Sequence, residues 1–250
     1  MRIAALYDIH GNYPALEAVL REVEQAHPDG ILIGGDIISG PMPAATLDRL
    51  LHLGDHVWFI RGNADREVVA AFDGAPLDPA MPAESREVTI WAAQQLTQRH
   101  RDFLAGLPER IVRQVDGMGD VLFCHGSPRS DVEIITAATP VSRLRAMLVG
   151  VEQRTVVCGH THMPFDRRID QTRILNAGSV GMPYGERGAY WLLLGPDAAQ
   201  QRTLYDFDQA AADIRASGYP QAQDFADNNV VNPPTAAEAI QVFERMANQR

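Results

Sequence analysis

Short apolar runs that each end in a small polar cluster are the feature that most restricts the fold of this chain. The first run, residues 3–7, leads into a polar loop and then into apolar residues at helical spacing, with Pro14 suited to a first helical turn. The same order of strand, loop and helix recurs from residue 30, and a third apolar run at residues 56–60 leads into a similar cluster. Alternation of this kind predicts a layered α/β sheet.

The second half of the chain has a different character. After a helical pattern at residues 84–104, short strand candidates follow one another, interrupted by a helix expected at residues 141–148. The strand candidates are residues 110–115, 121–124, 155–158, 165–169, 173–175, 189–194 and 202–205. This pattern predicts two sheets that face each other with helices outside. We expect one domain over residues 1–250, with residues 208–250 as a C-terminal helical extension.

Composition argues against several classes of protein. The chain has no apolar run of about 18 residues and no basic-then-apolar leader at its start, so we expect a cytoplasmic protein without a membrane partner. Its net charge of −10 is spread without basic blocks, which argues against an extended nucleic-acid interface. The two cysteines, Cys124 and Cys158, are interpreted as buried thiols rather than a disulfide.

Five polar clusters at the ends of apolar runs carry the candidate chemistry. Ligands bind outside the carboxyl ends of strands in open α/β sheets, so we expect the clusters to converge on one site. An isolated His or Asp at a strand end is more often a cap or a turn former. Here, however, four of the eight histidines lie in the clusters, beside Asp8, Asp36 and Asn63. The clusters are Asp8-Ile9-His10-Gly11-Asn12, Gly35-Asp36, Gly62-Asn63-Ala64-Asp65, His125-Gly126 and Gly159-His160-Thr161-His162.

Spacing within the clusters suggests paired ligands. Asp8 and His10 are two residues apart, as are His160 and His162, and an extended segment would place each pair on one side. The other histidines lie on helix or loop patterns, and we expect them at the surface: His27, His52, His56 and His100.

The ordered clusters resemble the signature of the calcineurin-like metallophosphoesterases, which runs Asp-x-His, Gly-Asp, Gly-Asn-His-Asp/Glu, a later His and Gly-His-x-His. All five blocks occur in order between Asp8 and His162. The resemblance extends to a small bacterial and archaeal phosphodiesterase branch through His-Gly-Ser-Pro at residues 125–128 and Asn-Ala-Gly-Ser-Val-Gly at residues 176–181, and it covers the chain to about residue 206. It implies a four-layer α/β/β/α sandwich of two mixed sheets flanked by helices.

The resemblance also implies a dinuclear metal centre, in which one residue, Asp36, bridges two ions. Imidazole and hard oxygen ligands without thiolate suit Mn²⁺, Fe, Co²⁺, Ni²⁺ or Zn²⁺, and Mn²⁺ is the ion that we expect to support activity in vitro. With two ligand aspartates and a bridging hydroxide, such a site has a charge of about +1, which attracts phosphate even to an acidic protein. The implied ligands are Asp8, His10 and His162 for one ion and Asn63, His125 and His160 for the other.

One position departs from the signature. Ala64 stands where the superfamily has a histidine that protonates the leaving group or positions the substrate. Members of the matched branch commonly lack this histidine too. Asp65 is retained, and it either orients His10 or acts as a helix N-terminal carboxylate. Asn12 either caps the following helix or contacts substrate. We place the catalytic roles on Asp36, Asn63 and Asp65, and the substrate contacts on Asn63, Arg61 and Asn12.

The implied activity is hydrolysis of a small phosphate diester by attack of a metal-bridging hydroxide. Two alternatives stay open: a phosphomonoesterase, including a protein phosphatase, and a non-catalytic metal-binding scaffold. A scaffold usually has gaps in the ligand set, whereas here every ligand position of the signature is filled. The oligomeric state is left open.

Overall fold

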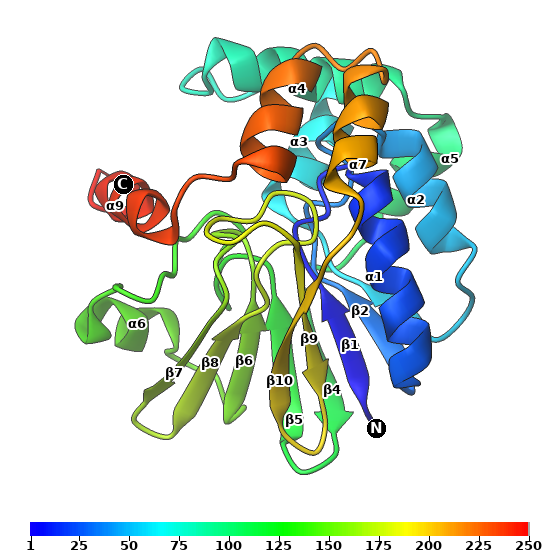
Figure 1. Ribbon diagram of the computed structural model, residues 1–250. Helices are drawn as coiled ribbons and strands as arrows, with labels where there is room; N and C mark the ends of the chain where they lie inside the picture. Colours follow the sequence, from blue (N-terminus) through cyan, green and yellow to red (C-terminus); the bar gives the residue numbers. More distant parts are fainter. Residues whose placement is uncertain (250) are drawn as a thin grey trace.

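A computed structural model of the protein describes residues 1–249 and contains two mixed sheets that face each other (Figure 1). The first sheet has the order β10-β9-β1-β2-β3, in which β1, β2 and β3 are parallel and β9 and β10 are antiparallel additions. Its strands are β1 (Ile3–Leu6), β2 (Gly30–Ile33), β3 (Val57–Phe59), β9 (Ala189–Leu194) and β10 (Ala198–Thr203).

The second sheet has the order β4-β5-β6-β8-β7, with β5, β6 and β8 parallel. The outer strands β4 and β7 pair antiparallel with their neighbours. Its strands are β4 (Arg110–Val115), β5 (Gly119–Cys124), β6 (Thr155–Cys158), β7 (Phe165–Ile169) and β8 (Thr172–Asn176).

Alternating side chains on the strands build the layers. In β1, Ile3 and Ala5 pack between the two sheets, where they join Phe123 of β5, while Ala4 and Leu6 pack against helices. Helices α1 (Tyr13–Ala26) and α2 (Pro43–Leu51) cover the first sheet, and α6 (Val141–Met147) covers the second (Figure 1). The predicted four-layer α/β/β/α sandwich is therefore confirmed.

The remaining helices pack around this sandwich, and two of them contribute Val68 and Leu104 to the same buried core as the first sheet. Val88 of α4 belongs to the same buried cluster as Ile214 of α7 and Phe225 of α8, so the C-terminal segment packs onto the body of the protein. None of the helices within residues 1–249 is long and apolar enough to cross a membrane. These elements are α3 (Asn63–Phe72), α4 (Ala83–Gln94), α5 (Gln98–Ala105), α7 (Phe207–Arg215), α8 (Ala222–Phe225), a π-helix (Ala226–Val231) and α9 (Ala236–Ala247).

Several expectations about local structure need correction. Residues 84–104 form two helices rather than one, because Thr97 begins a new helix by accepting a hydrogen bond from the His100 amide at 3.3 Å. His100 is buried rather than at the surface, since its Nε2 lies 3.0 Å from Asp48 Oδ1. The last strand is Ala198–Thr203 rather than residues 202–205. Cys124 and Cys158 are buried free thiols, as predicted.

The strand registers bring the polar clusters to one edge. Leu6 is level with Ile33, and Ile33 with Phe59, so β1, β2 and β3 end together. In the second sheet Phe123 is level with Val157, and Cys158 with Asn176. All five polar clusters therefore follow strands that end at the same side of the sandwich.

The segment that follows β8 joins the two sheets at this edge. The Gly181 amide donates to the Asp8 carbonyl at 3.0 Å, and Ser179 Oγ donates to the same carbonyl at 2.7 Å. Gly181 must be glycine, because an added Cβ would overlap the Ile9 carbonyl oxygen. The residues after β8 thus hold the backbone after β1 in place.

We predict that Gly181→Ala lowers the free energy of unfolding by about 1–3 kcal/mol, because the methyl group forces two backbone segments apart. Urea unfolding followed by circular dichroism measures this. Gly106→Ala is the matched control, since its Cβ would lie 3.5 Å from Asp102 and Phe103 carbonyl oxygens, an ordinary contact. An equal midpoint for Gly181→Ala and the unmodified protein would contradict the prediction.

Candidate metal centre

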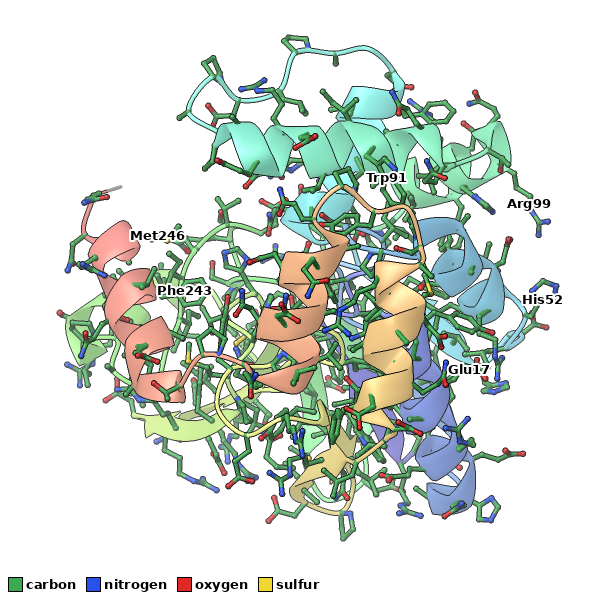
Figure 2. The ribbon with its side chains drawn as sticks, turned by 45° about the horizontal axis from the view of Figure 1, so that its top comes forward. Glu17, His52, Trp91, Arg99, Phe243 and Met246 are labelled. Carbon is green, nitrogen blue, oxygen red and sulfur yellow. The ribbon has the colours of Figure 1, made fainter. Side chains whose placement is uncertain are left out.

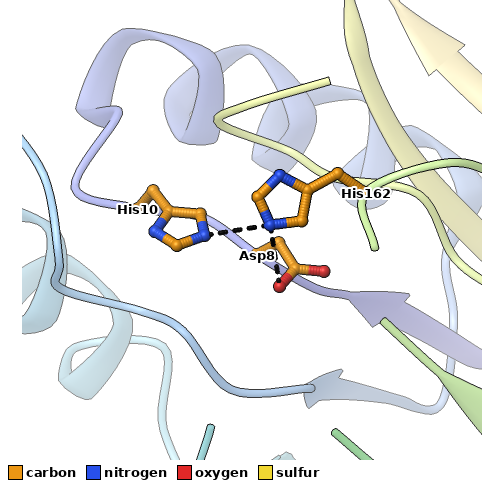
Figure 3. Close-up of side chains that lie close together, drawn as sticks. All are labelled: Asp8, His10 and His162. Carbon is orange, nitrogen blue, oxygen red and sulfur yellow. Dashed lines mark hydrogen bonds and ion pairs between the residues drawn. The ribbon is translucent and has the colours of Figure 1, made fainter. Parts of the chain in front are cut away.

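Asp8, His10 and His162 form the first of two groups of buried side chains at the strand ends (Figure 3). Their ligand-type atoms all lie within 4.8 Å of one another. His10 Nε2 lies 3.2 Å from His162 Nε2, and His162 Nε2 lies 3.5 Å from Asp8 Oδ1. Asp8 and His10, which lie two residues apart after β1, therefore share this group with His162 from the second sheet, whereas His160 belongs to the other group.

Asp36, His125 and His160 form the second group, also within 4.8 Å of one another. His125 Nε2 lies 3.3 Å from Asp36 Oδ2, and the same oxygen lies 3.7 Å from His10 Nε2 of the first group. The Asp36 carboxylate is thus located between the two groups.

Three buried atoms at this site lack a hydrogen-bond partner among residues 1–249: Asp8 Oδ1, Asn63 Oδ1 and His125 Nε2. A buried polar atom without a partner costs about 1–3 kcal/mol, so each of these atoms calls for a partner from outside the protein. All three are atoms that coordinate divalent cations.

The imidazoles are oriented as metal ligands usually are. His10 Nδ1 lies 3.0 Å from the Ser39 carbonyl oxygen, His125 Nδ1 lies 2.9 Å from that of Gly34, and His162 Nδ1 lies 2.8 Å from that of Met182. A carbonyl can only accept, so each Nδ1 is the donor, and in the neutral ring Nε2 presents its lone pair to the site. His10 Nε2 and His162 Nε2 lie 3.2 Å apart, a separation that a shared proton or a shared cation can bridge.

Charges within the cluster shift its titration strongly. Burial disfavours the charged form of His125, but the Asp36 carboxylate outweighs burial and raises the pKa of His125 to about 10. Burial would raise the pKa of Asp36, yet His125 holds that pKa well below its usual range. Burial and the positive charge of His125 together lower the pKa of His160 to about 4. The carboxylates thus require positive charge beside them, which protons or cations can supply.

The backbone at the site adopts a left-handed conformation that side chains other than glycine rarely adopt. An isolated non-glycine residue in this conformation costs about 1–2 kcal/mol. Our expectation of extended segments is therefore wrong, because the backbone turns at each pair. Asp8 and His10 still reach one group, as expected, whereas His160 and His162 lie in different groups. The φ values are 52° at Asp8, 47° at His10, 50° at Asp36, 65° at His160 and 60° at His162.

Hydrogen bonds between the loops hold this conformation. The His10 amide donates to the Asp36 carbonyl at 2.9 Å, and the Asp8 amide donates to the Gly35 carbonyl at 3.1 Å. The His160 amide donates to Asp8 Oδ2 at 2.9 Å. The strand-end loops therefore fix one another, and with them the side chains of both groups.

Asp65 does not orient His10, whose Nδ1 contacts Ser39 instead. Its Oδ1 accepts from the Ile37 amide at 2.8 Å and its Oδ2 from the Gly62 amide at 3.0 Å, so Asp65 acts as a helix N-terminal carboxylate that joins two strand-end loops. Burial, followed by the charge of Asp36, raises the pKa of Asp65 to about 7.

The other predicted contacts lie as follows. Asn12 is fully buried and caps α1: its Oδ1 accepts from the Ala15 amide at 3.2 Å while its Nδ2 donates to the Gly181 carbonyl at 2.9 Å. Arg61 Nη2 forms an ion pair with Glu109 Oε1 at 2.8 Å. Asn63 begins α3, and the next amide, that of Ala64, donates to Asp36 Oδ1 at 2.8 Å.

Sequence reasoning missed two parts of the site. The carbonyl groups of Gly34, Ser39 and Met182 orient the imidazoles, and any residue type could supply them. Tyr184, which stacks on His162, lies 22 positions along the chain from that histidine and belongs to none of the five clusters. Only the turn-forming segment at residues 176–181 signalled that this part of the chain approaches the site.

The fold and the site together define a metallophosphoesterase-type sandwich. Residues 1–197 match the calcineurin-like phosphoesterase superfamily domain, so the chain belongs to this family and is a phosphoesterase. Phosphodiesterase YfcE of Escherichia coli strain K12 is 26% identical over 219 residues, which span 82% of this chain and 94% of that protein. The uncharacterized protein MJ0912 of Methanocaldococcus jannaschii is 25% identical over 203 residues, 72% of this chain and 76% of its own.

Solved structures agree with this fold. A metallophosphoesterase from Sphaerobacter thermophilus is 28% identical with a TM-score of 0.72, and the match covers 91% of this chain and 97% of the other. The hypothetical protein PH1004 from Pyrococcus horikoshii OT3 has a TM-score of 0.80 at 21% identity, covering 94% and 99% of the two chains. The second match shows the shared fold alone.

We predict that Asp36→Asn reduces metal binding at both groups, because its carboxylate lies between them, whereas His162→Ala mainly weakens the first. Metal content per chain after equilibration with Mn²⁺, measured by elemental analysis, tests this. Asp120→Asn, an exposed residue of β5, is the matched control and should bind as the unmodified protein does. Full metal content in Asp36→Asn would refute the bridging role.

Proposed function

We propose that the protein is a metal-dependent phosphodiesterase that hydrolyses a small phosphate diester at a two-metal centre. The observation that carries this proposal is the pair of adjacent ligand groups, with the Asp36 carboxylate between them and unpartnered buried ligand atoms in each. Two divalent ions, with Mn²⁺ the first to test, would polarise the phosphoryl group and activate water for attack. They would be held by Asp8, His10 and His162, by Asn63, His125 and His160, and jointly by Asp36.

The protein's own groups prepare the site for an anion. Backbone carbonyls keep the Nδ1 protons of His10, His125 and His162 away from the centre, so each Nε2 is free to coordinate. Helix α3 begins at Asn63, and the partial positive charge of a helix N-terminus favours a bound phosphate. A rigid arrangement of this kind supports catalysis because little reorganisation is needed.

Charge favours a diester over a monoester. With both aspartates ionised and one hydroxide bound, the proposed site carries about +1, which a diester monoanion neutralises and a monoester dianion overcompensates. The name of the relative YfcE, a phosphodiesterase, supports the same class of substrate.

The test of the proposed function compares matched esters. Protein loaded with Mn²⁺ is expected to show a higher kcat/KM for bis(4-nitrophenyl) phosphate than for 4-nitrophenyl phosphate. The release of nitrophenolate measures both rates. Asp120→Asn again serves as the control that should retain activity. A monoester that is hydrolysed a hundredfold faster than its matched diester would overturn the diesterase assignment.

We predict that kcat/KM falls steeply as the pKa of the leaving group rises. The side chain of Ala64 ends in a methyl group and cannot protonate the departing oxygen, a role that contributes about 10²–10⁴-fold where a positioned acid fills it. A series of aryl methyl phosphates of graded phenol pKa measures the dependence under conditions in which chemistry limits the rate. A flat dependence in the unmodified protein would mean that another residue acts as the acid.

A further inference from the structure

Tyr184 borders the proposed metal centre. Its ring stacks on the His162 ring with centroids 5.5 Å apart and an angle of 18° between the planes. The same imidazole donates to the Met182 carbonyl, two residues before Tyr184, at 2.8 Å. The segment therefore holds His162 through its backbone and covers it with its aromatic side chain.

The Tyr184 hydroxyl has no hydrogen-bond partner within residues 1–249, although the side chain is half-buried. The hydroxyl belongs to a ring that stacks on His162, a side chain of the first ligand group. A donor in this position is normally satisfied by a ligand or by water.

Helix α9 supports the Tyr184 ring. Phe243 meets the ring edge to face, with centroids 6.0 Å apart and planes at 70°. Beside it, the Gly185 amide donates to the Pro234 carbonyl at 2.8 Å, in the segment that leads into α9. Figure 2 shows Phe243 on this helix, which lies apart from the helix that carries Trp91. Such aromatic pairs contribute about 0.5–1.5 kcal/mol and restrict the ring.

A single carboxylate fixes α9 to the loop that follows His125. Glu244 Oε1 accepts from Thr136 Oγ1 at 2.6 Å and from Thr139 Oγ1 at 2.7 Å, and Arg143 Nη2 donates to Glu244 Oε2 at 2.6 Å. Both threonines are buried. Helix α9 thus connects two loops that flank the centre, and it does so at the position of Tyr184.

We propose that Tyr184 binds the substrate directly, with its hydroxyl donating a hydrogen bond to a non-bridging phosphoryl oxygen and with Phe243 of α9 holding the ring in place. This inference rests on the proposed function and identifies a substrate contact that lies outside the five sequence clusters. The hydrogen bond stabilises the negatively charged phosphoryl group and transfers no proton. It therefore acts equally on esters with good and poor leaving groups.

The experiment compares Tyr184→Phe with the unmodified protein, both loaded with Mn²⁺, across a series of aryl methyl phosphates. Loss of one hydrogen bond to a charged group predicts a fall in kcat/KM of roughly ten- to a hundredfold. The fall should be the same for every leaving group, and two metal ions should remain bound per chain. Phe243→Leu should lower kcat/KM severalfold, again uniformly, because the ring is less well held.

Tyr190→Phe is the matched control. Its hydroxyl already has a partner, the Glu186 carbonyl at 2.9 Å, and its ring contacts none of the ligand groups in the described residues, so kcat/KM should stay unchanged. Activity of Tyr184→Phe within twofold of the unmodified protein, a loss that grows with leaving-group pKa, or a loss of metal would each overturn the inference and leave the proposed function standing. If the unmodified protein hydrolyses no phosphate ester with any divalent ion, both the inference about Tyr184 and the proposed function are overturned.

Discussion

The site depends on a backbone constraint. Five of its residues have a left-handed backbone conformation: Asp8, His10, Asp36, His160 and His162. Each such residue opposes folding by about 1–2 kcal/mol, so the surrounding structure must hold them there. The hydrogen bonds from the His10 and Asp8 amides to the loop after β2, and from the Ser179 hydroxyl and Gly181 amide to the Asp8 carbonyl, do this across both sheets. The facing sheets matter to function because they bring these loops within bonding distance.

The second constraint is electrostatic. Two buried aspartates lie among the imidazoles, and Asp8 Oδ1 and His125 Nε2 have no hydrogen-bond partner among residues 1–249, a combination that is costly without cations. The neighbouring charges lower the pKa of Asp36 and raise that of His125, which is the response expected of a cluster that lacks other counter-charge. Cations there would also give an acidic chain a local attraction for phosphate.

The sequence predicted the architecture and the convergence of the polar clusters because both follow from simple patterns, apolar runs that form strands and polar residues where strands end. It did not predict the left-handed turns at Asp8 and His160, since an Asp-x-His spacing is compatible with an extended strand as well. The sequence also left two roles open for Asp65, because the group that does contact His10 Nδ1, the Ser39 backbone carbonyl, leaves no trace in the sequence. The contact between α9 and Tyr184 depends on tertiary packing over a long separation along the chain.

The central claim is that the strand-end side chains hold two metal ions in a shared centre. Anomalous diffraction from crystals grown with Mn²⁺, recorded near the manganese absorption edge, tests it most directly. The account predicts two peaks about 3.5–4 Å apart, one beside each ligand group, with the Asp36 carboxylate between them. A single peak, or strong peaks only elsewhere on the protein, would contradict it.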